Sequence, residues 1–571
     1  MGSRVDPPRV LVEHYEESLD GELRQARGAH YTPTHLARLL VEIALDEFEA
    51  THGMLPSSLC DPSCGAGSIL LVMAEVLNER GLAPTEVLQR VTGGDLDVTS
   101  VGVAREVLAG WGRNHGLSDP RVSVEVLDAL GDRSDDTPFD VVVGNPPFAS
   151  PLTSGVAARR AARSGGGSVG RVGSPPQVGS PYTDDAARHL LAGTRMLADG
   201  GILCMLSPQS LLGARDTGWV RAELLEACEL TALWLSDEQF FEHASVHVCA
   251  PVLRRGGGPG ATPQVELIWR DRKVGRASVP TGGSWAPLMS AAMGTPSLAT
   301  PRISGDTAAR VPLEELARCT AGFRDEFYAL AACASERVET RTPPPAPDNE
   351  PPGALSSALS AVPTEPAPGQ GEGRLVTSGL IDPGVNRWGQ RMCRISGRRF
   401  SEPVVDLGRL ARESSRVARW CSARSVPKVL VATQTRVVEA CVDHRGDLLP
   451  LTPVVSVEPM DGVDPAAIAA VLSAPSVSLA IATGAAGTGL SSSAVRVSAS
   501  ALRNLMVPVG GDVLDRAVSL WSEFEGLAAS GTDATTWREI GGELDALTGS
   551  AAPEVIQWWV QRLPKGLFAS E

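Results

Sequence analysis

Four consecutive residues, Asn145-Pro146-Pro147-Phe148, have the types and the order needed to hold a planar amino group. The Asn side-chain oxygen and the backbone carbonyl of Pro146 can both accept hydrogen bonds from one NH2 group, because prolines fix the backbone and donate nothing. Phe148 then offers a ring face for stacking. Taken alone, the four residues are equally consistent with a rigid turn after a strand, since Asn and Pro are common turn formers.

An apolar, β-branched run precedes this turn. Residues 139–144 (FDVVVG) have the length and the composition of a buried parallel strand. In open α/β sheets, ligands bind beyond the carboxyl ends of such strands. We therefore expect the Asn-Pro-Pro-Phe segment to lie at a ligand-binding edge of a sheet.

A glycine turn lies upstream, between a predicted strand and a predicted helix. Residues 59–70 read LCDPSCGAGSIL, in which Gly65 and Gly67 let a ligand approach the backbone closely. The helix that follows directs its free N–H groups and the positive end of its dipole at the turn. This arrangement favours an anionic group there.

Two further predicted strands end in acids. The segment 91–97 (VTGGDLD) places Asp95 at a strand end, where a carboxylate can accept both hydroxyls of a ribose, and the strand 122–127 is followed by Asp128. Each feature alone is usually an ordinary turn or a solvated cap. Their order and spacing together favour a nucleotide-cofactor site.

The combined set resembles the S-adenosylmethionine-dependent DNA adenine-N6 methyltransferases, in the subgroup whose recognition domain follows the catalytic motif. Residues 28–33 (GAHYTP) are similar to the amino-terminal Tyr-Thr-Pro motif of that family. The resemblance implies that the glycine turn and Asp61 hold the methionine side of the cofactor, that Asp95 holds the ribose, and that Asp128 holds the adenine amine. The implied cofactor-binding residues are Tyr31, Thr32, Pro33, Asp61, Pro62, Gly65, Gly67, Asp95 and Asp128.

The same resemblance implies that Asn145, Pro146, Pro147 and Phe148 are catalytic. An adenine must leave the base stack to reach such a pocket, and stacking on Phe148 recovers roughly 1–3 kcal/mol of that cost. Acceptors at Asn145 and Pro146 would draw the amine toward a tetrahedral geometry and free its lone pair for attack on the methyl group.

Residues 240–249 (FFEHASVHVC) resemble, more loosely, a family segment that helps form the pocket for the flipped base. His243 and His247 lie in this segment, but no cysteine or carboxylate cluster completes a metal site around them. We therefore predict no bound metal.

The resemblance implies an α/β fold, a Rossmann-like class I methyltransferase sheet with a carboxy-terminal α+β target-recognition domain and terminal helices. The expected boundaries are a catalytic domain at 1–255 with a helical part at 1–50, a connecting segment at 256–310, a recognition domain at 311–510 interrupted by a Pro-rich linker at 341–373, and helices at 511–571.

The charge of the chain is unevenly distributed. The 571 residues carry a formal net charge of -16, which excludes a uniformly basic nucleic-acid binder. Residues 384–428 nevertheless hold eleven Arg or Lys against three acids, and this stretch could follow a phosphate backbone. The alternative is an arginine-rich surface without a ligand. A second basic piece, residues 157–175, lies among Gly and Ser in a predicted loop.

The expected partner is double-stranded DNA. No nuclease pattern of two acids and a lysine precedes Tyr31, so cleavage would need a separate restriction or defence subunit. Ten scattered cysteines, no secretory leader and no apolar run of membrane-spanning length favour a cytoplasmic protein without membrane contact.

Two alternative functions share these features. Enzymes that methylate RNA bases or a protein glutamine amide also grip a planar NH2 group, and a non-catalytic specificity protein could retain the fold. The large carboxy-terminal half favours DNA, and the intact set of cofactor motifs favours a catalyst.

Overall fold

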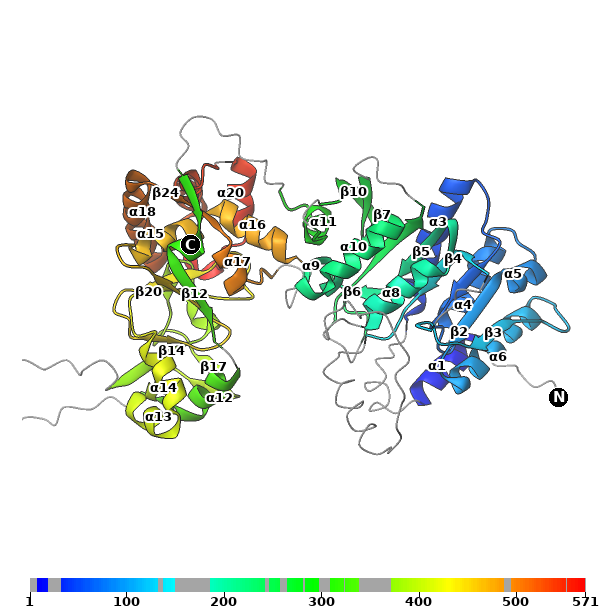
Figure 1. The fold of residues 1–571 in the computed structure, drawn as a ribbon, viewed down its shortest axis with the longest axis horizontal. Helices are drawn as coiled ribbons and strands as arrows, with labels where there is room; N and C mark the ends of the chain where they lie inside the picture. Colours follow the sequence, from blue (N-terminus) through cyan, green and yellow to red (C-terminus); the bar gives the residue numbers. More distant parts are fainter. Residues whose placement is uncertain are drawn as a thin grey trace, which may run out of the picture. The chain divides into compact units, whose positions relative to one another are not determined.

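The chain folds as two compact units in the computed structural model (Figure 1). The first unit comprises Met1–Thr295 and Ala486–Ser492, and the second comprises Pro296–Ala485 and Ser493–Glu571. The structure describes residues 8–18, 32–131, 137–148, 185–241, 246–256, 264–280, 283–296, 309–322, 324–337, 371–486, 494–550 and 552–569.

A mixed sheet of ten described strands runs through the first unit. Across the sheet, the strands follow the order β10 (Arg272–Ser278), β9 (Gln264–Trp269), β7 (Cys228–Leu235), β8 (Val248–Arg255), β5 (Leu197–Met205), β4 (Phe139–Gly144), β1 (Leu59–Asp61), β2 (Val91–Asp95) and β3 (Ser123–Val126). The short strand β6 (Ser207–Pro208) pairs with β8. The strands from β3 to β5 are all parallel, and β8 is antiparallel to both β5 and β7.

Alternate side chains of the central strands enter two different hydrophobic clusters, because successive residues of a strand point to opposite faces. Val141 and Val143 join one cluster, and Val142 joins the other. Five helices cover the first face, namely α1 (Pro8–Ser18), α3 (Thr34–His52), α4 (Ser68–Glu79), α5 (Pro84–Arg90) and α6 (Val98–Asn114). The second face is covered by α8 (Asp185–Arg195), α9 (Ser210–Gly213), α10 (Gly218–Ala227) and α11 (Ala286–Ala292).

The prediction of a Rossmann-like α/β sheet is confirmed, whereas the interpretation of 256–310 as a connecting segment is wrong in part. β9 pairs with β7 in parallel and β10 pairs with β9, so these strands extend the sheet of the first unit. Val265 and Leu267 of β9 are buried in the core of that unit. Because of this burial, the segment that contains β9 is part of the first unit and not a connection after it.

The second unit is α+β. One four-stranded sheet contains β12 (Ala317–Ala321), β23 (Val455–Pro459), β20 (Lys428–Val431) and β21 (Ala440–Asp443), and another contains β13 (Ala334–Glu336), β19 (Pro403–Asp406), β14 (Glu372–Val376) and β22 (Leu448–Pro450). Three pairs complete the described strands: β11 (Ala309–Pro312) with β24 (Met506–Val509), β15 (Ile381–Asp382) with β16 (Val385–Asn386), and β17 (Cys393–Ile395) with β18 (Arg398–Phe400).

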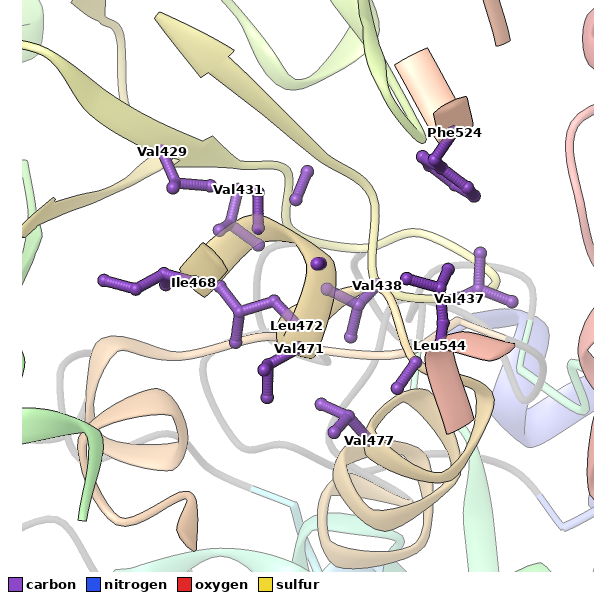
Figure 2. Close-up of a cluster of buried hydrophobic side chains, with 14 of the residues drawn as sticks. Val429, Val431, Val437, Val438, Ile468, Val471, Leu472, Val477, Phe524 and Leu544 are labelled. Carbon is purple, nitrogen blue, oxygen red and sulfur yellow. The ribbon is translucent and has the colours of Figure 1, made fainter. Parts of the chain in front are cut away.

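Helices pack on both sides of the sheet that holds β20. Val429 and Val431 face the larger cluster, in which Ile468 and Leu472 of α15 lie close to them (Figure 2), while Leu430 faces a smaller cluster. The larger cluster includes residues of α15 (Pro465–Leu472), α16 (Pro475–Ala485), α17 (Ala499–Arg503), α18 (Gly511–Ser530), α19 (Ala534–Leu547) and α20 (Pro553–Val560). The smaller one includes residues of α12 (Arg324–Cys333), α13 (Leu407–Glu413) and α14 (Ser415–Ser422).

The terminal helices are held by aromatic side chains. Phe524 lies 5.3 Å from Trp521 and 5.4 Å from Trp537 between ring centroids. Trp558 and Trp559 are buried in the larger cluster. Residues 338–370, most of the Pro-rich linker, lie outside the described part of the chain.

Among the described residues, no single helix is long and apolar enough to cross a membrane; α15 and α16 reach that length only as a pair bent by 63°. The ten cysteines all lie in the described ranges, are buried and form no disulfide.

Candidate active site

The strand order creates a switch point at β1. The chain proceeds from β1 through β2 to β3 on one side and then returns to β4 on the other side of β1. Leu59 pairs with Val141 and Cys60 with Val142, so the carboxyl ends of β1 and β4 lie next to each other. Ligands of open α/β sheets bind in the crevice at such a point. Asp61 and Asn145 are the residues at these two ends.

Asp61 is a buried carboxyl group at this edge, with 1% of its surface exposed. Burial raises the pKa of Asp61 to about 8, and the charge of Asp95 adds to the rise, while the backbone N–H of Ser63 opposes it. Gly144 makes room for this carboxyl, since a Cβ at that position would lie 3.0 Å from Asp61 Oδ1.

The predicted glycine turn joins β1 to α4. Gly65 and Gly67 have φ values of 51° and 92°, which residues with a side chain rarely adopt. A Cβ on Gly67 would also lie 3.1 Å from Ala104 of α6. Pro62 is buried in the same turn. Glycine at position 67 therefore lets the turn lie closer to α6 than a residue with a side chain would allow.

Asp95 holds this turn in place. Its Oδ2 accepts a hydrogen bond from the Gly65 N–H and its Oδ1 accepts one from the Asp97 N–H, both at 2.9 Å. A carboxylate oxygen has two lone pairs, so Asp95 has further acceptor capacity for hydroxyl groups. Leu96 beside it is 66% exposed.

Asp128 follows β3 at the same edge of the sheet. It is exposed, and its Oδ1 accepts a hydrogen bond of 3.0 Å from the Leu130 N–H. Leu130 is 44% exposed. Exposed leucines next to both Asp95 and Asp128 offer apolar surface that a planar ring can cover.

Thr32 connects three of the predicted motifs. The Asn145 side-chain Nδ2 donates to Thr32 Oγ1 at 2.9 Å, and the Ser68 hydroxyl donates to the Thr32 carbonyl at 3.1 Å. Thr32 itself is only 5% exposed. Pro33 follows it and caps the start of α3, where its carbonyl accepts from the Leu36 and Ala37 N–H groups. Tyr31 lies outside the described residues.

The aromatic residue of the catalytic motif has an aromatic neighbour. Phe148 and Phe241 lie 5.8 Å apart between centroids, edge to face at 70°. Pro146 is buried, and Pro147 and Phe148 are half-buried. The loosely matched segment 240–249 thus does approach the Asn-Pro-Pro-Phe segment through Phe241.

Two other predicted features cannot be placed. His243 and the arginine-containing segment 157–175 lie outside the described residues. Within the described ranges, no three His, Cys, Asp or Glu side chains are grouped so that they could hold a metal ion.

Sequence reasoning did not identify Ser68 or Gly144 as site residues. Ser68 begins the helix after the glycine turn, where a hydroxyl is also an ordinary helix-start residue. Gly144 ends a strand of valines, and an isolated strand glycine does signal a close approach of another group.

The amino-terminal half of the chain matches a known family. Residues 10–271 match the family model of the N-6 DNA methylases. These residues form a domain of this family. The match identifies the domain as that of an adenine-N6 DNA methyltransferase, and the family implies S-adenosylmethionine as the cofactor.

Solved structures resemble the chain over different lengths. The type IIL restriction-modification enzyme MmeI, solved in complex with DNA, is 12% identical with a TM-score of 0.55, and the match covers 98% of this chain and 79% of MmeI. The type IIG restriction endonuclease BpuSI is 13% identical with a TM-score of 0.42, over 98% of this chain and 68% of BpuSI. A type I methyltransferase subunit from Streptococcus thermophilus is 18% identical with a TM-score of 0.33, over 52% of this chain and 60% of that subunit. At this identity, the likeness to MmeI supports the fold of the whole chain and nothing finer.

Proposed function

We propose that the first unit binds S-adenosylmethionine at the carboxyl ends of β1, β2 and β3 and methylates the N6 amine of an adenine rotated out of duplex DNA. The second unit serves as the target-recognition domain. In this proposal Asn145, Pro146, Pro147 and Phe148 contact the target base, and the acids at the strand ends hold the cofactor.

The residues at this edge fit the cofactor. A buried carboxyl such as Asp61 is costly to ionise unless a cation faces it, and the cofactor carries a sulfonium and an ammonium group. Asp95 and Asp128 offer acceptors for ribose hydroxyls and for a ring amine. When bound, the cofactor supplies an electrophilic methyl group, and the protein supplies orientation and electrostatics.

Asn145 holds the target amine. Because its Nδ2 donates to Thr32 Oγ1, the amide is oriented with Oδ1 as its acceptor side. Together with the Pro146 carbonyl, this oxygen draws the two amine hydrogens toward the protein and makes the nitrogen lone pair available for attack on the methyl group. No nucleophilic side chain is needed.

Phe148 stabilises the extruded base. Extrusion costs a few kcal/mol, and stacking on an aromatic ring returns about 1–3 kcal/mol. The edge-to-face contact with Phe241 fixes the Phe148 ring and leaves less rotamer freedom to be lost on binding.

The biological role we propose is the marking of host DNA in restriction-modification or phage defence. Cleavage in such a system would come from a separate restriction or defence subunit.

One observation carries the catalytic assignment: Asn145 is fixed by Thr32 at the end of β4, beside Asp61 at the switch point. The test is Asn145→Ala in the full chain, assayed with radiolabelled S-adenosylmethionine and duplex DNA. We expect methyl transfer to be abolished while calorimetry shows nearly parental cofactor affinity, because the side chain acts on the target amine.

RNA and a protein bearing an exposed glutamine amide are assayed in parallel with the parental chain. Labelling of either one in place of DNA would assign the site to a different substrate. Parental transfer rates in Asn145→Ala would remove Asn145 from the catalytic centre.

A further inference from the structure

The β17–β18 hairpin of the second unit places two arginines directly opposite each other. Its two strands pair antiparallel with Arg394 opposite Arg399, and the turn between them is Ser396-Gly397. Both turn residues have positive φ, 48° for Ser396 and 82° for Gly397. This is the backbone of a tight two-residue hairpin turn.

Like charges directly opposite on a strand pair destabilise it. Within the described ranges, neither Arg394 nor Arg399 has an acidic partner, and both are exposed. Ser396 adds a backbone conformation that residues with a side chain rarely adopt. Two neighbouring cations without an acidic partner favour the binding of an anionic or electron-rich ligand.

Other arginines of the basic stretch 384–428 are already engaged. Arg391 and Arg387 pair with Asp382, at 2.6 Å and 2.9 Å. Arg409 pairs with Glu413 at 2.7 Å, and Arg416 with Glu326 at 3.4 Å. Arg412 and Arg419 of the stretch are also exposed without an acidic partner in the described ranges. The hairpin pair differs from the other arginines because its two guanidinium side chains come from directly opposite positions of one strand pair.

The opposite face of the hairpin fixes it to the unit. Cys393, Ile395 and Phe400 are buried in the smaller core cluster. Arg398 donates to the Ala331 carbonyl at 2.7 Å, and its guanidinium lies 5.2 Å from the centre of the Phe400 ring. The exposed pair therefore lies on a hairpin that is already fixed to the unit. Such a hairpin loses less conformational entropy when a ligand binds.

A pocket adjoins the same hairpin. It has a volume of about 410 Å³, and its lining includes Met392 and Arg394 of the hairpin together with the polar residues Thr377, Ser378 and Thr452. Met392 is 61% exposed. Hydroxyl groups, an apolar side chain and a guanidinium beside one another suit the edges of bases, whereas a phosphate contact needs only cations.

We propose that the β17–β18 hairpin enters the major groove of DNA and that Arg394 and Arg399 read base edges there, guanine O6 and N7 foremost. The major groove accommodates a two-stranded β-ribbon, and arginine contacts guanine with two parallel hydrogen bonds. This inference rests on the proposed function, because it assigns the recognition step of the same enzyme.

The test uses the full chain and a pool of duplexes randomised over about one and a half helical turns, from which bound DNA is recovered and sequenced. The first variant is Arg394→Lys/Arg399→Lys, which keeps both charges and removes the bidentate fork. The second is Arg394→Ala/Arg399→Ala. The matched control is Arg516→Ala/Arg538→Ala, which removes two exposed arginines from α18 and α19 of the same unit.

We expect the parental chain and the control to enrich one motif. Both hairpin variants should lose a guanine preference at one or two positions, with discrimination there falling about 5- to 100-fold. The lysine variant should retain its binding to unselected duplex and its salt dependence, because its charge is unchanged. Circular dichroism melting identifies any variant that fails to fold. If the alanine variant fails to fold, the test uses the lysine variant alone.

Enrichment of the parental motif by the lysine variant would overturn the inference. The inference would also fail if the alanine variant lost affinity equally for all sequences and the lysine variant restored that affinity fully, since this pattern belongs to a phosphate contact. A parental chain that enriches no motif would overturn it as well. A parental chain that enriches a motif but transfers no methyl group to it would refute the proposed function and leave the hairpin assignment standing.

Discussion

We propose that Thr32 positions Asn145 in addition to its proposed contact with the cofactor. Its hydroxyl fixes the Asn145 amide, and its carbonyl accepts from Ser68 at the start of α4. The resemblance to the Tyr-Thr-Pro motif implied a cofactor contact for Thr32. The hydrogen bond supports a proposed positioning role toward the target amine, because the hydroxyl holds one side of the Asn145 amide.

Thr32→Val tests this role, because valine has the shape of threonine without the hydroxyl. We expect kcat to fall about 10- to 100-fold from a misaligned Asn145. The cofactor Kd should remain near the parental value, since the backbone carbonyl is retained. Thr32→Ser restores the hydroxyl and should restore kcat. A Thr32→Val variant with parental kcat, or one whose defect lies wholly in cofactor affinity, would contradict the positioning role.

We expect Asp61 to give the proposed cofactor site a pH dependence. Its pKa of about 8, which results from burial and secondarily from Asp95, leaves it largely protonated at neutral pH before the ligand binds. A sulfonium cation favours the ionised form, so affinity for S-adenosylmethionine should rise from pH 6 to pH 8 and level off above. S-adenosylhomocysteine has the same amino acid end without the sulfonium charge. We therefore expect the affinity ratio of the two ligands to rise over this window, measured by calorimetry; a constant ratio would contradict the assignment.

The same pKa affects stability. The folded pKa lies above the unfolded value of about 3.9, so the folded state binds more protons between roughly pH 4 and pH 8, and the free energy of unfolding decreases as pH rises through that window. Asp61→Asn should remove this dependence. The variant should melt higher than the parental chain at pH 8 to 9 while losing affinity for S-adenosylmethionine.

At the scale of secondary structure, an ion pair buried between β20 and β21 stabilises the second unit. Lys428 Nζ and Asp443 Oδ2 lie 2.5 Å apart, with side chains 0% and 2% exposed. Asp443 also accepts from the N–H groups of Gly446 and Leu448, at 2.9 Å and 3.0 Å. Burial lowers the pKa of Lys428, and the charge of Asp443 opposes that change. The pair fixes the turn that follows β21.

Lys428→Met should destabilise the second unit by about 3–5 kcal/mol, because Asp443 then stays buried without a cation. Denaturant unfolding measures the loss. The matched control is Arg516→Ala, which removes an ion pair to Glu543 whose side chains are 54% and 53% exposed and should cost only about 0–1 kcal/mol. Equal losses of unfolding free energy in the two variants would show that the buried pair contributes no more to stability than the exposed pair.

At the scale of the whole molecule, the chain has two units with separate hydrophobic cores. We expect calorimetry of the full chain to show two unfolding transitions. S-adenosylhomocysteine at a hundredfold its Kd should stabilise one of them by about 2.7 kcal/mol. Lys428→Met should lower the other. A single transition that responds to both changes would mean that the units unfold as one.

The sequence by itself determined the order of the motifs and the elements that carry them. The strand at 139–144 occurs with the predicted bounds, because an apolar, β-branched run is a local signal. The acids at the ends of β1, β2 and β3 share one sheet edge, as their spacing predicted. Local patterns sufficed for recognising the family of the amino-terminal domain.

Only the tertiary structure decided which residues meet. The hydrogen bond from Asn145 to Thr32 spans 113 residues, the strands at 264–278 extend a sheet that their own sequence does not specify, and Arg409 and Arg416, two arginines of the basic stretch, are paired with acids. The opposition of Arg394 and Arg399 follows from the register of one hairpin. Such contacts depend on how distant segments pack, since a side chain's hydrogen-bond and ion-pair partners are set by the fold around it, and a local pattern contains no information about them.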